Sequence, residues 1–139
     1  MIIREANIED AKSIAKISSE SLGYPCDEKL VERRLSNLYK QKVFVVEEDE
    51  EIVGFVQAEL YQLLYQENSI NVLGLAIHKD FQIRGYGKAL MLRVEEWAKE
   101  MSCSKVRLNS EISRLAAHCF YESLGYKNTK SQKRFEKKI

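Results

Sequence analysis

A short segment with two glycines, residues 82–88, lies between an apolar run and a helical pattern and sets narrow limits on the fold. The preceding run, 70–77, is mostly apolar and predicts a strand that is buried on both faces. After the glycines, apolar residues recur at the spacing of one helix face, namely Leu90, Val94, Trp97, Ala98 and Met101. The chain is therefore expected to contain a buried strand, a tight turn and a long helix in direct succession.

The turn has the chemistry of a site for a diphosphate group. Gly85 and Gly87 let the backbone turn tightly and approach a ligand closely, and the helix that follows presents free N–H groups at its positive end. Arg84 and Lys88 add positive charge. A Walker loop needs four residues between its glycines, and a dinucleotide-binding fingerprint needs a small residue at Leu90, so neither of these motifs fits.

The rest of the chain predicts a mixed α/β fold in a single domain, residues 1–139, with a central sheet flanked by helices. The expected order is β-α-α-β-β-β-α-β-α-β-β, in which the second to fourth strands form an antiparallel meander and a helix makes a parallel crossover. Further strands are expected at 2–4, 43–46, 52–65, 105–109, 126–129 and 132–137, and further helices at about 8–22, 27–39 and 113–124.

Local signals mark where these helices begin and end. Asn7 with Asp10 three residues later predicts a capping box, and Gly23 predicts the end of that helix. Ser113 is expected to cap the last helix, and Gly125 is expected to end it.

Composition excludes several classes of function. With 22 Lys and Arg against 21 Asp and Glu, the net charge of +1 argues against nucleic-acid binding through a basic surface. No apolar run approaches the ~20 residues of a membrane span, and the N-terminus does not resemble a signal peptide. Three cysteines without a metal-ligand spacing predict reduced thiols in a cytoplasmic protein that binds no metal. The charges are segregated, because 47–51 are all acidic and 127–139 hold six Lys or Arg against one acid.

Two motifs resemble those of one enzyme family. Gln82-x-x-Gly85-x-Gly87, preceded by an apolar strand, resembles the acetyl-CoA signature of the GCN5-related N-acetyltransferases, or GNAT superfamily. The segment from Arg114 to Tyr126 resembles the second block of that family, and the order of elements matches along essentially the whole chain. The resemblance implies acetyl-CoA as cosubstrate and transfer of the acetyl group to a primary amine by direct attack in a ternary complex.

The resemblance also implies which residues contact acetyl-CoA. The strand backbone before the loop would bind the pantetheine arm, and the loop would bind the pyrophosphate. Arg114 and Phe120 would contact the cofactor from the second motif. The strand and loop positions are Leu75, Ala76, Ile77, Gln82, Ile83, Arg84, Gly85, Tyr86, Gly87 and Lys88.

The implied catalytic groups are a general acid and a base. Tyr121 matches the tyrosine that many members use to protonate the leaving thiolate. Members often carry a catalytic carboxylate at the positions of Asn71 and Asn109, so this sequence inherits no base there. Glu59 is the candidate base, and Glu111 is an alternative.

Three classes of function stay open. The first is an N-acetyltransferase acting on a small-molecule or peptide amine, whose site the 24–27 loop, Tyr61 and Tyr65 are expected to shape. The second is a CoA-binding module or sensor with little activity, which the two asparagines favour. The third, an RNA- or ribosome-associated protein with a basic C-terminal segment, fits poorly with the near-neutral charge. An exposed edge in the expected final hairpin could support a homodimer.

Overall fold

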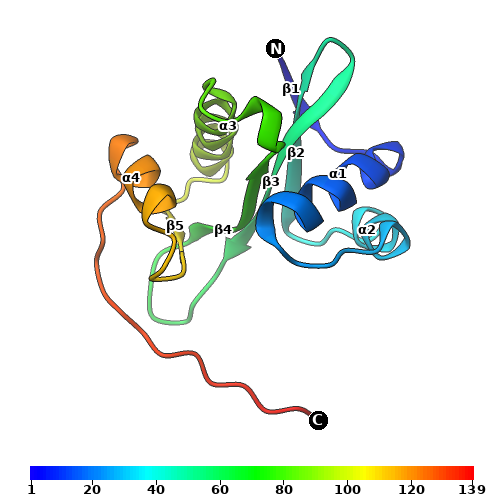
Figure 1. The fold of residues 1–139 in the computed structure, drawn as a ribbon. Coiled ribbons are helices and arrows are strands. Elements are labelled where there is room, and N and C mark those ends of the chain that lie inside the picture. The colour runs from blue at the N-terminus through cyan, green and yellow to red at the C-terminus, as the bar shows by residue number, and fades with distance from the viewer. The chain divides into compact units, whose positions relative to one another are not determined.

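A mixed five-stranded sheet organises the first part of the chain in the computed structural model, which describes residues 1–139 (Figure 1). The chain forms two compact units, Met1–Asn109 and Ser110–Ile139, which are described separately. The strands of the first unit are β1 (Ile2–Glu5), β2 (Gln41–Glu48), β3 (Glu51–Tyr61), β4 (Ser69–Ile77) and β5 (Lys105–Leu108).

The strand order is β1-β2-β3-β4-β5. The first four strands are antiparallel to their neighbours, and β5 is parallel to β4. The predicted meander and parallel crossover are thereby confirmed.

The acidic segment forms the turn between β2 and β3, as the sequence predicts. Asp49 and Glu50 both have positive φ angles, 50° and 65°, which suit a two-residue hairpin turn because their twist matches that of the strands. The neighbouring acidic residues belong to the strands themselves. Strand β3 ends at Tyr61, four residues earlier than expected, and Leu64 and Tyr65 beyond it are exposed.

The first helical segment contains three short elements. A 3₁₀ turn, η1 (Ile8–Asp10), leads into α1 (Ala11–Ile17) and a π-helical turn, η2 (Ser18–Leu22). The Asn7–Asp10 capping box is present, and Gly23, at φ 74°, ends the segment in the left-handed region. Both predictions from the sequence are confirmed.

The second helix, α2 (Glu28–Leu35), is shorter than the predicted 27–39. Its first turn is capped by the Asp27 side chain, which accepts a hydrogen bond from the Lys29 N–H group at 3.1 Å.

No helix in the structure is both long and apolar enough to cross a bilayer.

Helices cover both faces of the sheet in the first unit (Figure 1). On one face, α1 contributes Ile14 and Ile17 to a buried cluster with strand residues, namely Val43, Val45, Phe55 and Ala76. On the other face lies α3 (Tyr86–Glu100), whose buried stripe includes Leu90, Val94 and Trp97 as predicted. The Arg93 guanidinium lies 4.5 Å from the centre of the Phe44 ring, which belongs to the face opposite Val43 and Val45.

The second unit contains one helix, α4 (Leu115–Ser123). Arg114, rather than Ser113, occupies its N-cap position, and no side chain caps it, so the predicted Ser113 cap is wrong. Gly125 has φ 94°, which confirms it as the residue that follows the helix in the left-handed region.

The predicted closing hairpin at 126–129 and 132–137 is absent, because residues 126–139 form no strand. The physical reason is composition. Only Tyr126, Phe135 and Ile139 in this segment are apolar or aromatic, and they do not alternate with polar residues as a half-buried strand requires. The homodimer edge expected from that hairpin is therefore absent as well.

Candidate functional site

Strand β4 leaves its partner β5 partway along its length. The two strands pair only from Ser69 to Val72, whereas β4 continues to Ile77. Leu73 is an extra residue in the pairing of β4 with β3, and its side chain is 46% exposed. Beyond it, the predicted cofactor residues Leu75, Ala76 and Ile77 pair with β3 on one side and with no strand on the other. The expectation that β4 is buried on both faces holds only in part, because Leu73 is exposed and Gly74, Leu75 and Ile77 are only partly buried.

The end of β4 is tied to its surroundings by one carbonyl. The Ile77 carbonyl oxygen accepts hydrogen bonds from Ser21 Oγ at 2.8 Å and from Gln82 Nε2 at 3.1 Å. The Gln82 side chain therefore reaches back to the end of β4. Its hydrogen bond spans the segment between Ile77 and Gln82, which contains η3 (Lys79–Phe81).

The glycine loop then turns into α3 with two residues in the left-handed region. Ile83 has φ 61° and Gly85 has φ 90°. A Cβ atom added at Gly85 would meet no atom within 4 Å, so glycine is favoured there by its backbone angle and not by lack of space. The Ile83 side chain is fully exposed.

The loop offers unpaired main-chain donors to solvent. The first N–H group of α3 that donates within the protein is that of Ala89, to the Gly85 carbonyl at 3.0 Å. The N–H groups of residues 83–88 have no backbone or side-chain acceptor in the structure. A row of such donors at a helix N-terminus, with Arg84 and Lys88 exposed beside it, fits an anionic diphosphate group.

One loop side chain points into the protein. Tyr86 is buried, and its hydroxyl donates a hydrogen bond to Glu48 Oε2 at 2.9 Å. Burial, and then the Glu48 carboxylate, raise the pKa of the Tyr86 phenol, while Arg84 opposes the shift. The same hydrogen bond lowers the pKa of Glu48 against the effect of its burial. Tyr86 therefore anchors the start of α3 to β2, and only its backbone faces the loop.

Polar side chains form a row across β3, β4 and β5. Glu59 pairs in register with Asn71, and Asn71 pairs with Arg107. Asn71 Nδ2 donates to Glu59 Oε2 at 2.8 Å, and Arg107 Nη1 donates to Asn71 Oδ1 at 3.0 Å. Arg107 Nη2 also donates to Asn109 Oδ1 at 3.1 Å, and the guanidinium lies 4.9 Å from the centre of the Tyr61 ring. The structure thus joins Glu59 to both asparagines that the sequence analysis singled out.

Arg107 is the member of this polar row that sequence reasoning missed. The available signal was its place in β5, between the apolar residues Val106 and Leu108. Alternation puts Arg107 on the opposite face of the strand from these two neighbours, so a polar partner on that face was foreseeable.

The remaining predicted residues lie in the second unit. Arg114 precedes α4, and Phe120 and Tyr121 lie on it with their ring centroids 5.1 Å apart. The Tyr121 ring also contacts Tyr126 edge to face, with centroids 6.1 Å apart. Burial raises the pKa of the Tyr121 phenol, and the positive charge of Arg114 opposes this shift.

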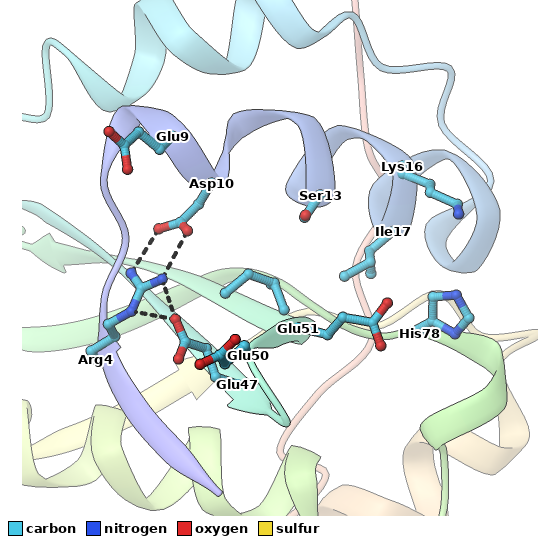
Figure 2. Close-up of a pocket in the computed structure, with 11 residues that line it drawn as sticks. Arg4, Glu9, Asp10, Ser13, Lys16, Ile17, Glu47, Glu50, Glu51 and His78 are labelled. Atoms are coloured by element: carbon cyan, nitrogen blue, oxygen red, sulfur yellow. Dashed lines mark hydrogen bonds and ion pairs between the residues drawn. The ribbon is translucent and has the colours of Figure 1, made fainter.

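A separate polar cavity of about 380 Å³ lies between α1 and the β2–β3 turn. Figure 2 shows Arg4 there between Asp10 and Glu47, to which its nitrogens donate at 2.6–2.9 Å. Burial would raise the pKa of Asp10, but hydrogen bonds from Arg4 and from the Asn7 N–H group hold it below its usual range. No predicted cofactor or catalytic residue lines this cavity. Among its charged side chains, Arg4 pairs with Asp10 and with Glu47.

The structure contains no group of three or more His, Cys, Asp or Glu side chains placed to hold a metal ion. Cys26, Cys103 and Cys119 are free thiols.

Comparison with known proteins identifies the family. The sequence model of the "Acetyltransferase (GNAT) family" matches residues 11–126, and the chain belongs to this family. An "Uncharacterized N-acetyltransferase" of Methanocaldococcus jannaschii is 25% identical over 131 residues, which cover 94% of this chain and 80% of that protein. A solved structure of AAC(6')-Iy, "in complex with bisubstrate analog CoA-S-monomethyl-acetylneamine", superposes with a TM-score of 0.86. It is 15% identical and covers 99% of this chain and 98% of its own, so it shows the fold.

A third relative is longer than this chain. The N-acetylaspartate synthetase of Rattus norvegicus is 34% identical over 80 residues, which cover 58% of this chain. That match spans only 26% of the rat protein, or about a quarter of its length.

Proposed function

We propose that this protein is an acetyl-CoA-dependent N-acetyltransferase, which moves an acetyl group to a primary amine by direct attack in a ternary complex. One observation carries the proposal: β4 has an unpaired edge beyond the end of β5, and it is followed, after η3, by a loop of unpaired N–H groups at the start of α3. Together these offer main-chain hydrogen bonds to a long amide-containing arm and to its diphosphate group. Membership of the GNAT family and the CoA analogue in the AAC(6')-Iy complex support this reading.

In this proposal, the backbone does most of the cofactor binding. The main chain of Leu75, Ala76 and Ile77 binds the pantetheine arm, and one of its N–H groups polarises the thioester carbonyl. The N–H groups of residues 83–88 bind the pyrophosphate, with the side chains of Arg84 and Lys88 beside it. Gln82 holds the loop against Ile77. Arg114 and Phe120 contact the cofactor from the second unit.

Proton transfer is assigned to Glu59 and Tyr121. A free amine has a pKa near 10 and must lose a proton before or during attack, and Glu59 accepts that proton directly or through one water. The new C–N bond forms as the C–S bond breaks, and the departing thiolate takes a proton from the Tyr121 hydroxyl. The raised pKa of Tyr121 suits this role, because the phenol stays protonated at the alkaline pH at which amines lose their proton.

The finer assignments complete the proposal. Residues 1–139 act as one catalytic domain on a small-molecule or peptide amine, with no metal, nucleic acid or membrane. The free thiols support a cytoplasmic location. The name of the rat relative, N-acetylaspartate synthetase, gives one example of N-acetylation.

A CoA-binding module or sensor is the second candidate. It is favoured by Asn71 and Asn109, since an amide cannot accept the proton of an ammonium group near neutral pH. In that case, Glu59 and its neighbours would only stabilise the sheet.

A thiol-release assay separates the two candidates. Acetyl-CoA is mixed with amines of several classes, including amino acids, polyamines, aminoglycosides and peptides, and released CoA and acetylated product are measured. The transferase proposal expects release that depends on one acceptor class. Tight acetyl-CoA binding without release from any acceptor would instead support the binding module.

A further inference from the structure

The Arg107 guanidinium contacts only neutral groups in the structure. Two of its nitrogens donate to the side-chain oxygens of Asn71 and Asn109, and its guanidinium lies over the Tyr61 ring. These contacts fix the direction of the side chain. They leave part of its fork of five N–H donors free.

The positive charge of Arg107 has no counter-ion within Met1–Asn109. The other arginines that contact the sheet of this unit do have one: Arg4 pairs with Asp10 and Glu47, and Arg93 pairs with two glutamates of α3. Keeping a half-buried cation without a carboxylate is costly, and an anionic ligand would remove that cost. A guanidinium is also suited by shape to a carboxylate, which it can bind through two parallel hydrogen bonds.

A negative group stands on the other side of the same asparagine. The Asn71 amide donates to Glu59 and accepts from Arg107, so opposite charges flank one side chain in the row. All three lie on one face of the sheet, because residues in register on neighbouring strands point the same way. A free amino acid carries the complementary charges, an amine and a carboxylate on one carbon.

We infer that Arg107 binds the carboxylate of the acceptor and that the acceptor is a free amino acid, whose amine faces Glu59. The inference rests on the proposed transferase function and names its substrate class. It gives Arg107 a binding role toward the carboxylate of the acceptor. A simple amine or an internal peptide lysine would leave Arg107 without its partner.

The test compares amino acids with the same amines lacking the carboxylate, such as L-phenylalanine with phenethylamine and L-leucine with 3-methylbutylamine. Wild-type kcat/KM, from thiol release at saturating acetyl-CoA, is expected to favour one or more amino acids. Arg107→Gln should lower kcat/KM for that amino acid about 10- to 100-fold, mainly through KM, as expected for a lost hydrogen bond to a charged group. For the decarboxylated partner, the same variant should lower kcat/KM far less. Arg107→Lys, which keeps the charge, should fall between.

Arg93→Gln is the matched control. This arginine is also half-buried and also lies over an aromatic ring, but on the other face of the sheet. The Arg93→Gln variant should have a lower melting temperature, but it should keep the wild-type ratio of kcat/KM between an amino acid and its decarboxylated partner. If Arg107→Gln lowered kcat/KM equally for an amino acid and for its decarboxylated partner, Arg107 would have a structural role. That result would overturn the inference.

Two further outcomes separate this inference from the proposed function. If CoA is released with simple amines as acceptors but with no amino acid, the inference is overturned and the transferase proposal stands. Absence of release from every acceptor would overturn the transferase. Calorimetric titration of L-amino acids into the complex with CoA then decides whether Arg107 binds them, because it needs no chemical step.

Discussion

The loop at the start of α3 and the polar row across β3, β4 and β5 are built from different parts of the chain. The loop presents main-chain N–H groups, and its one buried side chain, Tyr86, points away from them. The polar row presents side chains, and its geometry depends on hydrogen bonds between Glu59, Asn71 and Arg107. Recognition by backbone depends on φ and ψ angles, whereas recognition by side chains depends on residue identity at each position.

This difference predicts a division of labour. Acetyl-CoA binding should respond to changes in backbone conformation at the loop and little to changes in the polar row. The identity of the acceptor should respond to the polar row and little to the loop. One family can then keep its cofactor while its members differ in acceptor.

The largest effect is expected for Glu59→Gln, which keeps the shape but removes the proposed proton acceptor. Turnover should fall about 10³-fold, within the range for loss of a general base. The dissociation constant of acetyl-CoA should stay unchanged, which calorimetry measures. Glu51→Gln on the same strand, at an exposed position, is the control. Wild-type turnover of the Glu59→Gln enzyme would show that the general base does not lie in the polar row.

The next effect is expected for Tyr121→Phe, which belongs to neither region. Turnover at saturating acetyl-CoA should fall about 10²-fold, because the leaving thiolate loses its proton donor. Since the pKa of Tyr121 is raised, the wild-type enzyme should keep its turnover into the alkaline range in which an ordinary tyrosine ionises. The pH–rate profiles of both proteins measure this. Equal turnover of the two proteins at every pH would contradict the assignment.

Gly85→Val tests the loop through its backbone. A β-branched residue is strained at φ 90°, so the loop should relax and turn its N–H groups away from the pyrophosphate. The dissociation constant of acetyl-CoA should rise about 10-fold, equivalent to about 1.4 kcal/mol. Gly23→Val imposes similar strain at φ 74°, also in open space, and should lower stability without this effect. Equal weakening by both variants would show that the loop has no special role.

The smallest effect on binding is expected for Tyr86→Phe, which keeps the buried ring and loses the hydrogen bond to Glu48. The dissociation constant of acetyl-CoA should change by less than about threefold, because the side chain anchors the helix and does not face the ligand. A change of this dissociation constant above 10-fold would mean that the loop does not bind acetyl-CoA through its backbone alone.

The same variant has a pH signature in stability. The Tyr86 hydrogen bond lowers the folded-state pKa of Glu48, so it stabilises the protein above the ordinary titration range of a glutamate. That contribution is lost as the pH falls through the lowered pKa. The difference in melting temperature between wild type and Tyr86→Phe should therefore be largest near neutral pH and vanish in acid. A difference that stays constant with pH would contradict the carboxylate partnership.

The sequence predicted best those features that depend on local backbone chemistry. The Asn7–Asp10 capping box and the left-handed glycines Gly23, Gly85 and Gly125 were all recognisable, because each residue type is favoured by its own backbone geometry. The glycine loop belongs to this class, and it is one of the two motifs that carried the resemblance to the family.

Features that depend on contacts between distant segments were less predictable. The expected hairpin after Tyr126 rested on short segments without a clear alternation, and it does not form. Glu59 and Asn71 were singled out one by one, but their connection to each other and to Arg107 required the registers of three strands. No local pattern specifies those registers, so the polar row became visible only in the structure.

The most direct test of the account is an initial-rate matrix in which acetyl-CoA and the best acceptor are varied together. Direct transfer between a backbone-built cofactor site and a side-chain-built acceptor site predicts double-reciprocal lines that intersect, because both substrates must be bound before either product leaves. Parallel lines, with an acetyl group recovered on Cys26, Cys103 or Cys119, would show an acyl-enzyme and contradict the account.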